Sequence, residues 1–109
     1  MTFHPTNNPV FWKQTADELL AAKRFEKAAA AFQQLCDLTP NDADAWCGLG
    51  QALAGLERYG DAVASFERSL VLRPDAQDAL EGLAGCYEAR GEFEKVAACR
   101  IRLGELSQN

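Results

Sequence analysis

The side chains best suited to chemistry in this chain are the thiols of Cys36, Cys47, Cys86 and Cys99. Zinc sites usually take cysteines in Cys-x-x-Cys pairs, but here successive cysteines lie 11, 39 and 13 residues apart. A cysteine nucleophile needs a neighbouring base, and the only histidine, His4, lies near the N-terminus. We therefore expect no metal or other cofactor, no cysteine catalysis, and reduced thiols that pack as small hydrophobic side chains.

Carboxylate pairs such as Asp75/Asp78 and Glu92/Glu94 are a second possible source of acid–base chemistry. No histidine adjoins either pair, and negative charge is favoured at the exposed start of a helix by the helix dipole. We expect these carboxylates to stabilise helix starts. The chain is predicted not to be an enzyme.

The glycine-rich segment CGLGQALAG, residues 47–55, raises the possibility of a phosphate-binding loop. Such a loop needs a strand before it and a helix after it, but the preceding TPNDADAW is a turn followed by acidic and alanine residues. Trp46, Leu49, Leu53 and Leu56 recur at the spacing of one helix face. The glycines therefore lie inside a helix, where each costs about 1 kcal/mol relative to alanine and needs a packing or functional reason.

The composition is that of a single small globular domain: 109 residues, 48% hydrophobic and 25% charged. No segment approaches the roughly 18 apolar residues of a membrane span, and the N-terminus lacks the pattern of a secretion signal. A cytoplasmic location is expected. The net charge is −5 and basic residues never cluster beyond a pair, which disfavours a nucleic-acid partner.

The elements that position these residues follow from an internal repeat of 34 residues. A shift by this period superimposes the following pairs: Trp12 on Trp46, Leu19 on Leu53, Ala28 on Ala62, Phe32 on Phe66 and Pro40 on Pro74. A third copy follows in the same register, with Phe93 after Phe25 and Tyr59. This kind of periodicity indicates stacked units, each covering the apolar face of its neighbour.

Each repeat contains two stretches of helical periodicity separated by a short turn, AKRF, LERY or RGEF. Asn8 before Pro9 is a suitable N-cap for the first helix, and Asp42 and Asp75 are suitable for the third and fifth. The pattern predicts an all-α fold after an N-terminal tail at residues 1–8. The six helices are expected at residues 9–22, 25–38, 43–56, 59–72, 77–90 and 93–106.

The repeat resembles the tetratricopeptide family, whose pattern the second copy meets with Trp46, Leu49-Gly50, Leu53, Ala62, Phe66 and Pro74. The first copy has Thr15-Ala16 in place of Leu-Gly, and the third has Val96 and Arg100 in place of the small residue and the phenylalanine. The resemblance implies a right-handed superhelix of three helix-turn-helix units in one domain at 9–109. The units are expected at residues 9–42, 43–76 and 77–109.

The 34-residue register predicts where the glycines, the phenylalanines and Arg100 lie in the stack. Gly50 is expected at the crossing of the two helices of its unit, which does not explain Gly48 or Gly55. Phe32 and Phe66 are expected to be buried between repeats, whereas a charge is costly to bury, so Arg100 is expected to face solvent on the last helix.

The family resemblance further implies that the first helix of each unit lines a concave groove that holds a peptide or helix of another protein. The residues expected there are Lys13, Asp17, Asp44, Cys47, Gly48, Gln51, Gly55, Asp78, Glu81, Gly82, Gly85 and Glu88. Five carboxylates and one lysine give the first helices an acidic balance. The acidic residues have the alternative role of a solvated face.

Family members that bind acidic chaperone tails use a clamp of lysine, asparagine and arginine, of which only Lys13 is present. Asp17 and Asp78 stand at clamp positions and would repel an acidic tail. We expect instead a segment with basic and apolar residues. Gly48, Gly55, Gly82 and Gly85 would let its backbone approach closely.

Two other functions remain open. The segments FQQLCDL, DADAWCGLG and YGDAVASF resemble the three-repeat chaperones of type III secretion translocators, which implies a dedicated chaperone. The repeats could also stack on other copies of the chain and form a homo-oligomer. Solution mass distinguishes these readings, since an adaptor is a stable monomer and an assembly module associates with concentration.

Overall fold

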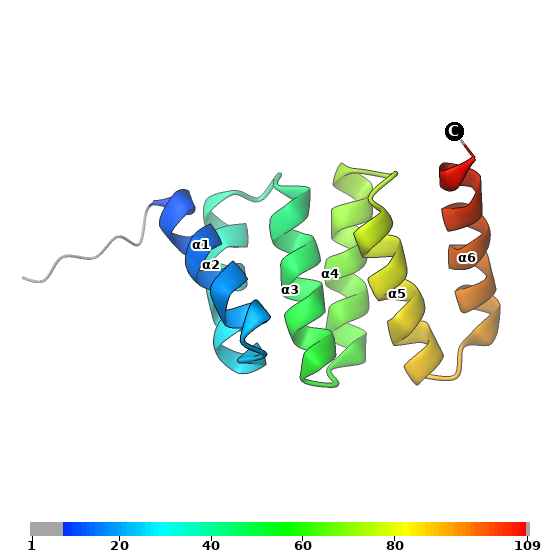
Figure 1. Ribbon diagram of the computed structural model, residues 1–109, viewed down its shortest axis with the longest axis horizontal. Coiled ribbons are helices and arrows are strands. Elements are labelled where there is room, and N and C mark those ends of the chain that lie inside the picture. The colour runs from blue at the N-terminus through cyan, green and yellow to red at the C-terminus, as the bar shows by residue number, and fades with distance from the viewer. Residues whose placement is uncertain (1–7, 109) are drawn as a thin grey trace, which may run out of the picture.

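A computed structural model describes residues 8–108 as an all-α chain of six helices (Figure 1). The helices are α1 (Pro9–Ala21), α2 (Phe25–Leu38), α3 (Ala43–Gly55), α4 (Tyr59–Leu72), α5 (Gln77–Ala89) and α6 (Phe93–Ser107). Every helix end lies within one residue of its predicted position. Of the predicted tail at residues 1–8, only Asn8 is among the described residues, and His4 lies outside them.

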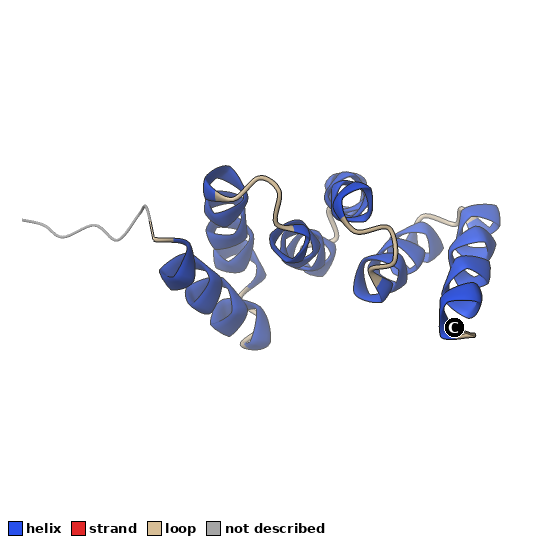
Figure 2. Ribbon diagram, turned by 90° about the horizontal axis from the view of Figure 1, so that it is seen from above, coloured by secondary structure: helices blue, strands red, loops and turns tan. Residues whose placement is uncertain are grey.

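The helices form three antiparallel pairs that follow one another along the long axis of an elongated molecule, 54 × 29 × 20 Å (Figures 1 and 2). Each helix contacts the next in sequence, and the first helices of successive pairs also contact each other, α1 with α3 and α3 with α5. The stack therefore has one end formed by α1 and α2 and another formed by α6.

The helix starts follow the 34-residue register. Asn8 accepts a hydrogen bond from the Val10 backbone N–H at 3.0 Å, and Asp42 accepts from the N–H groups of Asp44 and Ala45 at 3.0 and 3.4 Å, so both predicted caps are confirmed. The prediction for Asp75 is wrong. The register of Asn8 and Asp42 leads to Ala76, which is the N-cap of α5 and makes no side-chain capping bond.

The turn inside each pair contains one residue in the left-handed region, and these residues also repeat every 34 positions: Lys23 (φ 60°), Glu57 (φ 62°) and Gly91 (φ 74°). A glycine adopts this conformation freely, while a residue with a Cβ is strained there by about 1 kcal/mol. The common backbone of the repeat thus imposes the same turn on three different residue types.

Two phenylalanine rings join the pairs. Phe32 on α2 is 2% exposed and Phe66 on α4 is completely buried, as predicted. A Cβ added to Gly50 would lie 2.8 Å from the Phe66 ring, which confirms that glycine is needed where the helices of the second pair cross. The Ser69 hydroxyl, also buried, donates to the Ala43 carbonyl at 2.8 Å and ties α4 to the start of α3.

Candidate protein-binding groove

The first helices α1, α3 and α5 lie side by side and carry most of the predicted groove residues on an exposed surface. We call this surface the groove face; its exposed members are Lys13, Asp17, Asp44, Gln51, Gly55, Asp78, Glu81, Gly85 and Glu88. Between α3 and α5 the surface is hollowed, and Asp44 and Asp78 both line the hollow. A second hollow lies on α1, where Val10 adjoins Lys13 and Asp17.

Two of the predicted glycines, Gly48 and Gly82, are largely covered, and the expectation that they admit a ligand backbone was wrong. A Cβ on Gly48 would lie 2.3 Å from the Phe32 ring, and one on Gly82 would lie 2.3 Å from the Phe66 ring. Gly55 is exposed, but the ring of Phe25 lies on one side of it, 2.4 Å from an added Cβ. These glycines admit the aromatic rings of the preceding repeat. Gly85 alone among the four has open space beside it.

The charge of the groove face is lower than the first helices suggest, because two of its carboxylates have arginine partners from other elements. Arg73, which follows α4, pairs with Asp44 at 3.0 Å. Arg100 on α6 lies 3.7 Å from Glu88 and is 65% exposed, as predicted for this arginine. Asp17, Asp78 and Glu81 make no ion pair within residues 8–108. They provide the uncompensated negative charge of the face.

Cys47 is also not an exposed groove residue, since its side chain is 8% exposed. Burial, with smaller contributions from the carboxylates of Asp78 and Asp44, raises the pKa of this thiol to about 11, although Arg73 opposes the shift. Burial likewise raises the pKa of Cys36 to about 12. All four cysteines are free and buried. At neutral pH the thiols are therefore protonated, and a protonated thiol is a poor nucleophile and a poor metal ligand.

We expect these thiols to react slowly in the folded protein. With a pKa near 11, only about one Cys47 in a thousand is ionised at pH 8. A chromogenic disulfide reagent should therefore label the native protein far more slowly than the urea-unfolded protein, in which four thiols are available. Rapid labelling of one thiol in the folded state would contradict the burial described above.

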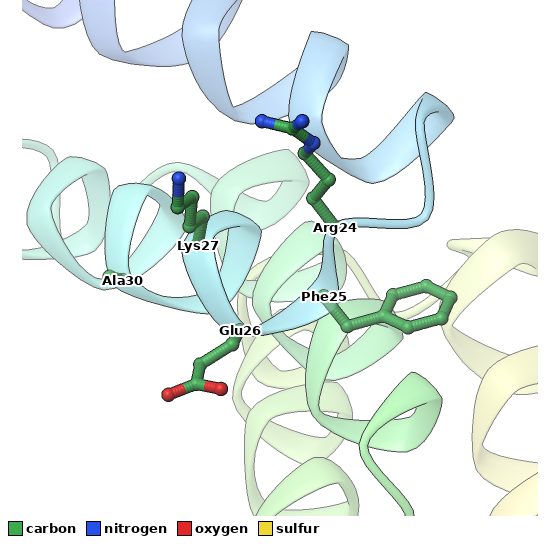
Figure 3. A pocket seen from close by; sticks show the side chains of 5 residues that line it. All are labelled: Arg24, Phe25, Glu26, Lys27 and Ala30. Carbon is green, nitrogen blue, oxygen red and sulfur yellow. The ribbon is translucent and has the colours of Figure 1, made fainter.

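Another hollow lies outside the groove face, around the first turn of α2 (Figure 3). Arg24 and Lys27 extend to one side of this turn, while Glu26 and Phe25 extend in other directions (Figure 3). The side chains do not converge on one point, as the ligands of a small molecule would. This surface was not predicted from the sequence, although Arg24 directly precedes the predicted helix at 25–38 and Lys27 lies in its first turn.

Among residues 8–108, no group of three or more histidine, cysteine, aspartate and glutamate side chains is placed to hold a metal ion. None of the six described helices has the length and apolar character needed to cross a membrane.

Solved structures with a similar fold include two bacterial proteins. MamA from Desulfovibrio magneticus RS-1, residues 41 to the end, superimposes with a TM-score of 0.90 at 20% identity, covering 94% of this chain and 58% of that one. A second MamA structure, AMB-1, gives 0.87 at 23% identity, covering 93% and 60%. This chain thus spans less than two thirds of either MamA chain.

The type III secretion translocator chaperone SycD of Yersinia enterocolitica superimposes with a TM-score of 0.88 at 24% identity, covering 93% of this chain and 76% of that one. These likenesses establish the fold. No curated protein sequence gave a significant match.

The sequence itself matches the family model of the tetratricopeptide repeat twice, over residues 14–70 and 48–97. The matched residues include most of α1 and extend into α6, so they cover the greater part of the three helix pairs. The chain belongs to the tetratricopeptide repeat family.

Proposed function

We propose that the groove face binds a segment of a partner protein, and that the chain acts as an adaptor or scaffold. The observation that carries this proposal is the set of unpaired carboxylates of Asp17 on α1 and of Asp78 and Glu81 on α5, the two first helices on either side of α3. Asp78 also lines the hollow between α3 and α5, so a bound segment could lie in that hollow and meet the charge.

The chemistry of the face favours a basic segment with apolar side chains. Exposed carboxylates each contribute at most about 1 kcal/mol, but several together accelerate the association of a positively charged partner. Val10, 72% exposed beside Asp17 on α1, offers an apolar contact next to the charge. An acidic chaperone tail would meet repulsion from the same carboxylates, and nucleic acid would do so along its whole backbone.

We expect the double substitution Asp78→Lys with Glu81→Lys to lower the affinity for the partner, and the affinity should fall more at low salt than at high salt. The partner is first recovered by co-purification from the native cell and identified. It is then titrated by calorimetry against the wild type and the double variant at two salt concentrations. A matched control is Glu57→Lys with Glu67→Lys, which makes the same change in net charge at exposed positions outside the groove face.

The control separates a local effect from a change in overall charge. If both double variants lower the affinity for the partner equally, only net charge matters and the groove face is not the binding surface. Equal affinity of all three proteins would leave the acidic residues as solubility determinants. Circular dichroism checks that each variant retains its helices.

The proposal includes recognition without catalysis, since the buried thiols have raised pKa values and the carboxylates lie on an open surface. It also includes a cytoplasmic location, because free thiols persist in a reducing compartment. A narrower version is a dedicated chaperone of a type III secretion substrate, supported by the fold shared with SycD. Its test is whether co-expression of a translocator protein yields a soluble complex.

A further inference from the structure

The two ends of the helix stack carry surfaces that correspond to the two sides of an internal junction. At the junction between the first two pairs, Phe25 and Phe32 of α2 cover Gly55 and Gly48 of α3. At the last helix the corresponding residues are Phe93, 66% exposed, and Arg100, 65% exposed. No described helix follows α6 in the stack (Figure 1).

The exposed side of α6 carries large apolar side chains that a surface in contact with water does not need. Ile101, also 65% exposed, stands where α2 and α4 have the exposed polar residues Gln33 and Glu67. A solvated end of the stack gains nothing from replacing these polar residues with isoleucine. Phe93 and Ile101 thus point to a surface that is covered by another helix.

The opposite end of the stack supplies residues suited to this surface. In the 34-residue register, α1 has Ala21 where α3 has Gly55, so an exposed small residue is available beneath a Phe93 ring. It has Gln14 where α3 has Gly48, the glycine that faces Phe32. At the internal junction a phenylalanine faces a glycine. At the two ends of the stack, the corresponding positions have Arg100 on α6 and Gln14 on α1, so both partners of this contact are polar there.

Charge also matches between the two ends. Glu26 on α2 and Arg58 and Asp61 at the start of α4 line one hollow between successive second helices. In the 34-residue register Glu94 corresponds to Glu26, while Arg24 and Lys27 correspond to Arg58 and Asp61. If a second copy continued the stack beyond α6, Glu94 would therefore lie opposite the Arg24 and Lys27 of that copy, the basic residues around the hollow in Figure 3. Glu94, Arg24 and Lys27 are exposed and form no ion pair within the described residues.

We propose that copies of this chain associate head to tail, with α6 of one copy covered by α1 and α2 of the next. Such an interface is heterologous, because each copy contributes a different surface, so it continues into longer assemblies unless a rotation closes it. The inference is independent of the groove proposal, since it uses other residues, and each can fail without the other.

The experiment measures mass by sedimentation velocity over a wide range of concentration. The wild type is expected to grow beyond a dimer as concentration rises. Phe93→Lys blocks the α6 end and Ala21→Lys blocks the α1 end, so each variant alone is expected to remain monomeric. Their equimolar mixture is expected to form a dimer and nothing larger, because each partner contributes one intact end. Val71→Lys, a change at another highly exposed apolar residue, is the control and should associate like the wild type.

Several results would overturn the proposal. A wild type that stays monomeric at every concentration would show that a second copy does not cover α6. Association of both single variants at wild-type strength would place the interface elsewhere. A mixture that stays as monomeric as its two components would show that an intact α6 end does not bind an intact α1 end. Circular dichroism spectra establish that the lysine variants are folded.

Discussion

Replacement of Phe66 by alanine is expected to lower the free energy of unfolding by about 3–5 kcal/mol, the usual cost of emptying a large aromatic site in a core. The Phe66 side chain is fully buried, and its ring lies against Gly50 of α3 and Gly82 of α5. One substitution therefore loosens both a helix pair and the junction to the next pair. Domains of this size have a total stability of roughly 5–15 kcal/mol, so urea unfolding should show a large shift of the midpoint.

Phe93→Ala is the matched control, since it removes the same atoms from a ring that is 66% exposed. At a protein concentration low enough to prevent association, its effect should stay within about 0.5 kcal/mol, as for other surface substitutions. Equal losses in the two variants would mean that the junctions are not where the structure places them.

Gly82→Ala is expected to destabilise the protein by about 1–3 kcal/mol, the range for overpacking a core. The new Cβ would lie 2.3 Å from the Phe66 ring, so the ring or the helix has to move. Gly85→Ala, one turn further along α5, meets nothing within 4 Å. It should instead stabilise the protein by about 0.5–1 kcal/mol, because alanine favours the helix.

Both variants add one methyl group to α5, at positions three residues apart. Chemical or thermal unfolding measures the change in stability, which is expected to have opposite signs in the two variants. Stabilisation by both would show that the Phe66 ring moves aside at little cost. Destabilisation by both would show that Gly85 is also packed, contrary to the open space beside it.

The sequence predicted the fold well because the 34-residue period fixes the elements in three places at once. Helix ends, the buried Phe32 and Phe66, and the exposed Arg100 all follow from that register. The error at Asp75 arose from residue preference. Aspartate is a favourable N-cap, yet the register places Ala76 at the cap of α5 and leaves Asp75 in the preceding loop.

The glycines of the groove helices were harder to interpret, because a helical pattern shows which residues share a face but not how far a neighbouring side chain reaches. A signal was present nevertheless. Phe25 and Phe32 are seven residues apart on α2, and Gly48 and Gly55 are seven residues apart on α3. Matching spacings on adjacent antiparallel helices indicate ring-to-glycine packing, which the structure has at both positions.

The charge of the groove could not be read from the first helices alone. Arg73 follows α4 and Arg100 lies on α6, yet each approaches a carboxylate of a first helix. Their partners are 29 and 12 residues away in the chain, so only the folded arrangement shows which carboxylates are compensated. The binding role of the remaining carboxylates stays a prediction.

The contacts between helices have a consequence for how the chain acquires its fold. Within residues 8–108, each helix contacts only the next helix or, for α1, α3 and α5, the next but one. No contact joins α1 or α2 to α5 or α6. Chains with such local contacts fold rapidly, because little loop entropy is lost before native contacts form. The first two helix pairs can therefore assemble while a ribosome is still translating the third, and the new pair then adds to a surface already in place.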